Sequence, residues 1–347
     1  MIIGVTGYGG TGASAYTALF KEFEGTQLNW ELEFQLLQEP DGILDLEYAL
    51  VHSKSRIRSN AAIKRFIKNL DHLDTFGKKV LVKATNGVYV SLSKEYINKL
   101  IDTRWLGRSN FDPTDLQPSK IVSYIYKVRR AINRFLKLEV PECRSERYYS
   151  LCESEKFSQI TKKYLEEVVK ACGFDLTKNV FLEQLFTCTN PLDGSHFFDE
   201  VKSIVVDRDP RDIYIQSNYL LNKHYFMFMP NSGSVDEFIK YYRLLHSHKV
   251  DAPNVLYVNF EDLMYRYDDT AAKMCDFLGS KHINKRKYFH PEKSINNTML
   301  YKRYPKMRAE IEKIEKELSE YLYDFDKYAN NLDYTPEVID PAVAGLF

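Results

Sequence analysis

The chain of 347 residues contains 44% hydrophobic and 14% aromatic residues, so it is a globular protein with a sizeable core and not a disordered one. Its 48 basic and 48 acidic residues cancel, which argues against a general binder of polyanions and requires any anion site to be local. A nucleic-acid partner is therefore not expected.

A glycine-rich turn follows the first expected strand. Ile2 to Thr6 is predicted to form that strand, and the turn from Gly7 to Ser14 leads into a helix expected from Ala15 to Phe23. The glycines fit both the G-x-G-x-x-G pattern and the glycine spacing of a P-loop. Both patterns place backbone N–H groups and a helix N-terminus around an anion. The candidate binding residues are Gly9, Gly10, Thr11, Gly12, Ala13 and Ser14.

Three interpretations of this turn stay open. A P-loop requires a lysine where Ala13 stands, so ordinary hydrolysis of ATP or GTP is not expected. A dinucleotide-binding fold requires an acidic residue after its second strand, and Glu39 follows a strand expected from Leu32 to Leu37. The glycines are also compatible with a tight strand-to-helix turn that binds nothing.

The middle of the chain changes from strand patterns to helical patterns. Leu44 to Lys68 is predicted to be helical, and the apolar residues Val80 to Val82 predict a buried strand that ends at Lys83. From about residue 91 to residue 178, long helical patterns predict a helical insertion. Within it, apolar residues recur at helical spacing between Ile121 and Phe135, and we interpret this stripe as core.

The sheet is expected to resume after the insertion. Val180 to Gln184 and Val255 to Val258 are expected to be short strands, and Ile204 to Val206 is an apolar run typical of a strand buried on both faces. Arg208 follows this run closely, at the carboxyl end of its strand, where open α/β sheets bind ligands. The order of elements predicts an α/β fold with a mostly parallel sheet flanked by helices. A structural cluster of arginine and aspartate residues is the alternative explanation for the charges around Arg208.

The predicted organisation is one domain over residues 1–334, interrupted by the insertion at about 91–178 and followed by a tail at 335–347. The sequence shows neither a signal-peptide pattern nor an apolar run of 18 residues, so a cytoplasmic protein without a transmembrane segment is expected. The cysteines are odd in number and form no CxxC pair, which predicts a reducing compartment and no metal site. They are Cys143, Cys152, Cys172, Cys188 and Cys275.

Three motifs stand in order along the chain. The turn from Gly7 to Ser14 comes first, Arg208-Asp209-Pro210-Arg211-Asp212 with Ser217 comes second, and Phe260-Glu261-Asp262-Leu263 ahead of Phe277-Leu278-Gly279 comes third. Together they resemble the sulfotransferases that use 3′-phosphoadenosine 5′-phosphosulfate (PAPS), especially the bacterial members. The resemblance covers about half of the chain and implies the P-loop-like fold of that family.

This resemblance implies transfer of a sulfuryl group from PAPS to a hydroxyl or amine of a saccharide or small-molecule acceptor, with adenosine 3′,5′-bisphosphate as the other product. It implies that the glycine-rich turn holds the 5′-phosphosulfate and that Arg208 holds the 3′-phosphate. The serine of the family motif usually falls eight residues after the arginine, at Gln216 here, so either Gln216 or Ser217 completes that contact. The last cofactor-contacting segment of the family is similar to Lys293, Ser294 and Asn296.

The chain departs from the family pattern at the phosphosulfate loop and at the catalytic base. The family loop usually carries a lysine or arginine, which is absent here, and we expect Lys83 to supply that charge. The family base is a histidine or a glutamate. Glu183, at a strand end, is the first candidate for it, His196 is the second and Glu33 is the third.

Two other functions stay open. An NAD(P)-binding oxidoreductase of the Rossmann type, with Glu39 on the ribose, explains the turn but gives no reason for the motif at Arg208. An inactive sulfotransferase-like scaffold that binds a partner through the insertion would explain the missing loop lysine. The 25 tyrosines favour a saccharide as the acceptor, because such rings stack on sugars.

Overall fold

The structure is a computed structural model that describes residues 1–71, 76–108, 120–136, 144–220 and 234–337. The chain forms two compact units. The first unit combines Met1–Gln35 with Phe174–Phe347, and the second unit is Leu36–Gly173. The second unit therefore interrupts the first one in sequence.

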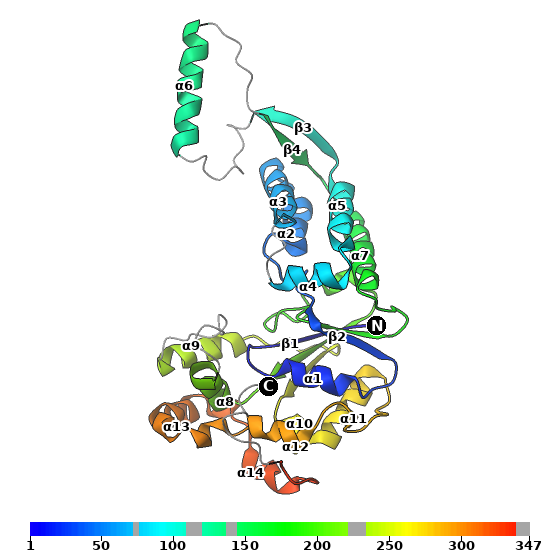
Figure 1. Cartoon of the computed structure of the whole chain (residues 1–347), viewed down its shortest axis with the longest axis vertical. Helices are drawn as coiled ribbons and strands as arrows, with labels where there is room; N and C mark the ends of the chain where they lie inside the picture. Colours follow the sequence, from blue (N-terminus) through cyan, green and yellow to red (C-terminus); the bar gives the residue numbers. More distant parts are fainter. Residues whose placement is uncertain (72–75, 109–119, 137–143, 221–233, 338–347) are drawn as a thin grey trace. The chain divides into compact units, whose positions relative to one another are not determined.

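The first unit is built on a five-stranded parallel sheet (Figure 1). The strands lie in the order β2-β5-β1-β6-β7, so β1 is central and β2 and β7 are the edges. Because every strand runs in the same direction, all five carboxyl ends meet at one edge. The strands are β1 (Ile2–Gly7), β2 (Thr26–Glu33), β5 (Asn179–Glu183), β6 (Val201–Asp207) and β7 (Val255–Asn259).

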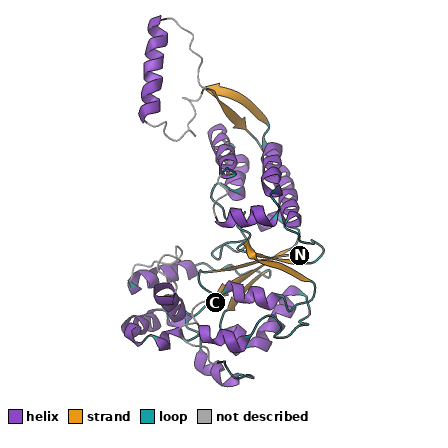
Figure 2. Cartoon of the chain, viewed as in Figure 1, coloured by secondary structure: helices purple, strands orange, loops and turns teal. Residues whose placement is uncertain are grey.

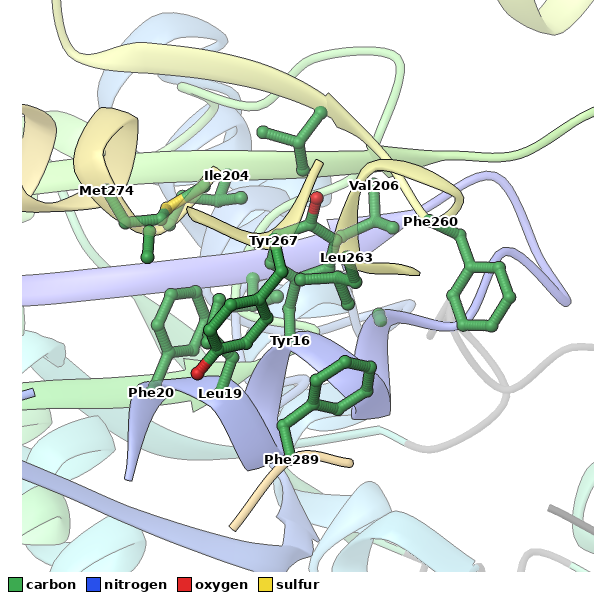
Figure 3. Packing of buried hydrophobic residues seen from close by; sticks show 14 of the residues in the cluster. Tyr16, Leu19, Phe20, Ile204, Val206, Phe260, Leu263, Tyr267, Met274 and Phe289 are labelled. Atoms are coloured by element: carbon green, nitrogen blue, oxygen red, sulfur yellow. The ribbon is translucent and has the colours of Figure 1, made fainter. Parts of the chain in front are cut away.

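Helices α1 (Ala13–Phe20), α10 (Asp262–Tyr265) and α11 (Tyr267–Leu278) pack on one face of this sheet. Figure 3 shows Tyr16, Leu19 and Phe20 of α1 in the same cluster as Ile204 of β6 and Met274 of α11. Tyr16, Leu19, Ile204 and Met274 have no exposed surface. This apolar layer fixes α1 on the sheet, and with it the glycine-rich turn that α1 follows.

The remaining helices of the first unit follow β6 and β7, except for the short turn η3 ahead of β6. A second buried cluster joins α8, α9 and α13 through Ile213, Tyr242 and Ile314. The α-helices are α8 (Pro210–Ile215), α9 (Val235–His246), α12 (Pro291–Ser294), α13 (Arg308–Glu317) and α14 (Phe325–Tyr328). Short helical turns are η3 (Ser195–Phe197), η4 (Gln216–Leu220), η5 (Ile295–Asn297), η6 (Leu300–Arg303), η7 (Pro305–Met307), η8 (Ser319–Tyr321) and η9 (Ala329–Asn331).

The second unit consists of helices and one antiparallel strand pair (Figure 2). Its helices α5 and α7 pack through buried rings, with Tyr96 and Tyr164 stacked 4.3 Å apart. The helical elements are α2 (Ile43–Glu47), η1 (Tyr48–His52), α3 (Arg56–Asn69), α4 (Phe76–Ala84), α5 (Val88–Leu100), α6 (Lys120–Leu136) and α7 (Ser154–Ala171). The strand pair is β3 (Thr103–Arg108) and β4 (Arg144–Tyr149). In the described ranges, no helix combines the length and the apolarity that crossing a membrane requires.

The structure confirms the predicted α/β class, with a parallel sheet flanked by helices, and corrects its details. The strand expected at Val80 to Val82 is part of α4, because a short apolar run does not distinguish a strand from a buried helix face. The helical unit therefore begins at Leu36 and not near residue 91. The expected second strand lies earlier, at Thr26–Glu33, where an edge strand alternates apolar and polar residues. Residues 338–347 of the expected tail lie outside the described residues.

Candidate active site

A cavity of about 650 Å³ lies at the carboxyl ends of β1, β5 and β6. Its walls come from the glycine-rich turn, the end of β5, the residues on either side of α8 (Arg208 and Gln216) and the segment around α12. This is the edge at which parallel α/β sheets bind their ligands. Lining residues include Gly9, Gly10, Thr11, Gly12, Ala13, Ser14, Glu183, Gln184, Arg208, Gln216, Phe260, Tyr288, Phe289, His290, Lys293, Ser294 and Asn297.

The glycine-rich turn wraps one end of the cavity. Gly9, Gly10 and Gly12 have left-handed φ angles of 92°, 67° and 80°, which side chains other than glycine rarely adopt. Gly12 is also the N-cap of α1, and a Cβ atom there would lie 2.5 Å from the ring of Phe260. Two separate constraints, the left-handed φ angle and the close approach of Phe260, therefore require glycine at position 12. The turn runs directly into the N-terminus of α1. Backbone N–H groups at a helix N-terminus stabilise bound anions.

Replacing Gly12 by alanine tests this close approach. Gly12→Ala should lower the free energy of unfolding by more than the about 1–2 kcal/mol expected for a left-handed residue, because the new methyl group also displaces Phe260. The matched control is Gly25→Ala, since Gly25 has φ of 68° and a Cβ atom added there would meet nothing within 4 Å. Urea denaturation of the two variants measures the difference, and equal losses would contradict the packing argument.

Arg208 leaves the end of β6 and forms part of the cavity wall, with 4% of its surface exposed. Its Nη1 donates to the carbonyl oxygen of Gly10 at 3.1 Å and to Oε1 of Gln216, and its Nη2 donates to the carbonyl oxygen of Asn297. The guanidinium carbon lies 4.7 Å from the centre of the Phe260 ring. Within the described residues, Nε is buried without a hydrogen-bond partner. Its hydrogen bonds to described residues all go to uncharged oxygens, so an anionic acceptor can replace one of them.

The other charged residues of this motif hold the start of α8. Asp209 caps the helix by accepting from the N–H of Arg211 at 2.9 Å, and its Oδ2 lies 2.7 Å from Nη2 of Arg211. Arg211 also reaches Glu315 of α13 at 2.9 Å. Burial, reinforced by the charge of Asp209, raises the pKa of Asp212 to about 7. Of the charged residues in this motif, Arg208 alone lines the cavity. The motif therefore combines one candidate binding residue with a cluster of charges that holds the helix in place.

Gln216 and Ser217 differ in what they contact. Gln216 lines the cavity and accepts a hydrogen bond from Arg208. Ser217 is 1% exposed, and its hydroxyl donates to the carbonyl oxygen of Ile213 in the preceding helix α8 at 2.7 Å. Of the two alternatives from the sequence, Gln216 is therefore the one that faces the cavity.

Glu183 is the last residue of β5 and lines the same cavity as Arg208. Burial and, second, the nearby carboxylate of Glu33 raise its pKa to about 7. Burial also raises the pKa of Glu33, whose Oε2 accepts from Gln35 at 2.8 Å. A carboxylate that titrates near neutrality is the kind of group that exchanges protons during catalysis.

Glu22 organises the wall that carries Tyr288 and Phe289. It has no exposed surface, and its Oε1 accepts from the N–H groups of Tyr288 and Phe289, both at 2.9 Å. Its Oε2 accepts from the N–H of Arg286 at 3.1 Å and lies 2.9 Å from Nε2 of His282. Burial opposes the ionisation of Glu22, but the bond from Phe289 and the other hydrogen bonds outweigh it and lower its pKa.

Glu22→Gln should destabilise the protein, because an amide cannot accept all of these hydrogen bonds. Each donor left unsatisfied costs about 1–3 kcal/mol. Since the pKa of Glu22 is lowered in the folded state, its contribution is present above the unfolded pKa of about 4.3 and is lost as the pH falls through the folded pKa. Urea denaturation at pH 7 and below pH 4 should show a difference from wild type that shrinks in acid. Glu24→Gln, at an exposed position, is the control.

The structure separates the remaining predicted residues into two groups. Lys293 and Ser294 line the cavity, whereas Asn296 does not and donates instead to the carbonyl oxygens of Lys293 and Glu337. His196 is exposed and precedes the amino end of β6, away from the carboxyl edge where the cavity lies. Lys83 is exposed on α4 of the second unit, so the expectation that it ends a strand of the sheet beside Arg208 is wrong.

Several lining residues escaped the sequence analysis. Gln184, Tyr288, Phe289, His290 and Asn297 carry no motif, and Glu22 acts through backbone bonds that no spacing reveals. Of these residues, Asn297 could have been predicted, because it directly follows the predicted cofactor-contacting segment of Lys293 to Asn296. In the part of the chain that the structure describes, no group of three or more histidine, cysteine, aspartate or glutamate residues is placed to hold a metal ion.

The strand order argues against a dinucleotide site of the Rossmann type. In that fold the second strand lies beside the first one and carries the acidic residue for the ribose. Here β5 lies between β1 and β2. Glu39 lies beyond the end of β2, in the second unit. The two parts that a dinucleotide would require are therefore not neighbours in the sheet.

Comparisons with known proteins give distant similarities. No family model matches the sequence, and no curated protein matches it. Among solved structures, the chain is similar to the sulfotransferase domain from the curacin biosynthetic pathway at 11% identity and a TM-score of 0.32, over 80% of this chain and 73% of that one. It is also similar to retinol dehydratase, solved in complex with androsterone and the inactive cofactor PAP, at 16% identity and a TM-score of 0.33, over 93% of this chain and 81% of that one.

Proposed function

We propose that this protein is a sulfotransferase that moves a sulfuryl group from PAPS to a hydroxyl or amine of a saccharide or small-molecule acceptor. The observation that carries the proposal is that one cavity joins the glycine-rich turn, Arg208 and Glu183, whose pKa lies at about 7. An anion cradle, a buried cation and a base that titrates near neutrality are the three groups that such a transfer requires.

The residues present fit the nucleotide at both of its charged ends. The N–H groups of residues 9–14 and the N-terminus of α1 would hold the 5′-phosphosulfate. Lys293 lines the same cavity and would supply the charge that Ala13 does not. Arg208 would hold the 3′-phosphate through its Nη1 and Nη2 atoms, which now donate to uncharged oxygens.

The bound cofactor would supply an activated sulfuryl group. The backbone N–H groups of the turn would stabilise the negative charge that grows on the leaving phosphate oxygen. Glu183 would accept the proton of the attacking hydroxyl or amine, and its raised pKa makes it a better proton acceptor at pH 7 than an ordinary carboxylate. Tyr288 and Phe289, held by Glu22, supply aromatic surface in the same cavity.

The pH dependence of turnover should report Glu183. A base must be ionised, so kcat/KM is expected to rise with pH through about 7 and then level off. Glu33→Gln removes the negative charge that helps to raise this pKa, so the rising limb should move to lower pH. Glu31→Gln, at an exposed position on the same strand, is the control. An unchanged limb in Glu33→Gln would contradict the assignment of the base.

Thermal denaturation with three nucleotides tests the proposed cofactor against its rival. Adenosine 3′,5′-bisphosphate at about a hundredfold excess over Kd should raise Tm by about 3–6 °C, with a smaller rise for AMP and none for NADPH. A rise with NADPH and none with the bisphosphate would overturn the proposal in favour of the oxidoreductase. Binding of the bisphosphate without turnover of PAPS on a broad panel of hydroxylated acceptors would favour the inactive scaffold.

A further inference from the structure

Helix α6 (Lys120–Leu136) exposes its apolar stripe, so the expectation that this stripe belongs to a core is wrong for its described side chains. Tyr124 is 68% exposed and Phe135 is 88% exposed. The stripe recurs every three or four residues, so it forms a single face along the helix. Its exposed members among the described side chains are Tyr124, Ile125, Val128, Ile132, Phe135 and Leu136. A continuous exposed face of this size marks an interaction surface.

The charge on α6 has one sign. Residues 120–136 include Lys127, Arg129, Arg130 and Arg134 and contain no aspartate or glutamate. The whole chain has no net charge, so the positive charge of this helix is a local feature. Lys127, Arg130 and Arg134 fall on the side of the helix away from the apolar face, at the i, i+3 and i+7 positions. The surface that receives α6 must therefore be apolar where it meets the stripe and negative around it.

The neighbouring strand pair repeats this combination. Trp105 and Leu106 of β3 are 42% and 61% exposed. Successive side chains of a strand point to opposite faces, so Arg104 shares its face with Leu106, and Trp105 shares its face with Arg147, its partner in β4. Tryptophan beside arginine is the residue combination enriched where proteins meet the headgroup region of a bilayer. The two strands are the elements that precede and follow α6 in the chain, so both observations belong to one stretch of the second unit.

We propose that α6 docks on the surface of an anionic lipid membrane, with its apolar face at the boundary of headgroups and acyl chains and its basic side chains among the headgroups. An amphipathic helix with lysine and arginine on the polar side and aromatic and aliphatic residues on the other side lies in the plane of such a surface. Nucleic acid would meet the charge but leave six exposed apolar residues without a partner. The inference does not depend on sulfuryl transfer, since membrane binding is measured without nucleotide.

Sedimentation of the full chain with vesicles tests the proposal. The chain should sediment with vesicles of phosphatidylcholine containing about one third phosphatidylglycerol, and should not sediment with pure phosphatidylcholine. Raising the salt from 0.1 M to 0.5 M should weaken the binding, because anionic headgroups attract Lys and Arg through screened charges.

Two double variants divide the contributions. Arg130→Gln with Arg134→Gln should weaken binding to the anionic vesicles about 30-fold, at about fivefold for each basic residue near the surface. Ile132→Ser with Phe135→Ser should abolish sedimentation at the same lipid concentration. Arg56→Gln with Lys94→Gln removes the same charge from exposed positions on α3 and α5 and should change the affinity less than threefold.

Three outcomes would overturn the proposal. One is absence of binding to the anionic vesicles, which would assign the face to an acidic protein partner. Another is equal binding by wild type and the Ile132/Phe135 variant. The third is an equal loss in the control pair and the Arg130/Arg134 pair, which would indicate a general charge effect. Circular dichroism of each variant confirms that the fold is retained, because all of the substituted side chains lie on exposed positions.

Discussion

Glu183→Gln is expected to lower kcat by about 10²- to 10⁴-fold, the range over which a positioned general base accelerates proton transfer. Glutamine has nearly the same shape but accepts no proton at neutral pH. Glu183 lies at the end of β5 in the cavity wall, and its pKa of about 7 means that it is ionised in a large fraction of molecules at physiological pH. The affinity for adenosine 3′,5′-bisphosphate should stay within about threefold, because the phosphates are assigned to other residues.

Release of adenosine 3′,5′-bisphosphate from PAPS in the presence of acceptor measures this effect, and calorimetric titration measures the affinity. His196→Gln is the matched control, because His196 was the second candidate from the sequence and lies exposed, outside the cavity lining. It should leave kcat within about twofold. If His196→Gln lost activity and Glu183→Gln kept it, the assignment of the base to the end of β5 would be incorrect.

Arg208→Ala is expected to weaken the binding of adenosine 3′,5′-bisphosphate by about 10- to 150-fold, the equivalent of about 1.5–3 kcal/mol for hydrogen bonds to a charged group. AMP lacks the 3′-phosphate and should lose less than about threefold. The reason is that Arg208 lies in the cavity wall, where its Nη1 and Nη2 atoms donate to uncharged oxygens that an anionic acceptor can replace. Equal losses for the two nucleotides would show that Arg208 only supports the glycine-rich turn through Gly10.

A second variant separates binding from folding. Arg208 is nearly buried and bonds Gly10, Gln216 and Asn297, so its removal also loosens three segments. Arg208→Lys keeps the charge and loses the forked geometry, and it should show an intermediate affinity for the bisphosphate. Urea denaturation of both variants establishes how much of any loss comes from unfolding.

The parts of the fold that follow from continuous apolar runs were predicted well. The runs at Ile2, Val180 and Ile204 are buried strands of one parallel sheet, and the run at Val255 is its half-buried edge strand β7. The edge strand β2 was placed too late, because an edge strand alternates and its boundaries are weakly marked. The strand pair β3 and β4 was missed, because short basic strands joined through a long intervening segment lack the turn signal of a hairpin.

The candidate site was predictable where backbone conformation dictates sequence. Gly9 and Gly12 need left-handed φ angles, and Arg208 follows a buried strand directly, so both were found. Lys83 was misplaced because Val80 to Val82 has the composition of a strand, and its helical state depends on packing within the second unit. The role of Glu22 could not be predicted from the sequence, because it accepts hydrogen bonds from backbone groups more than 250 residues away in the chain.

A crystal structure of the complex with adenosine 3′,5′-bisphosphate tests the central claim most directly. We predict the 5′-phosphate within hydrogen-bond distance of the N–H groups of residues 9–14, the 3′-phosphate on Arg208, and the carboxylate of Glu183 facing the position of the transferred group. Lys293 should approach the 5′-phosphate. A nucleotide bound elsewhere, or bound in this cavity with its 3′-phosphate away from Arg208, would contradict the account.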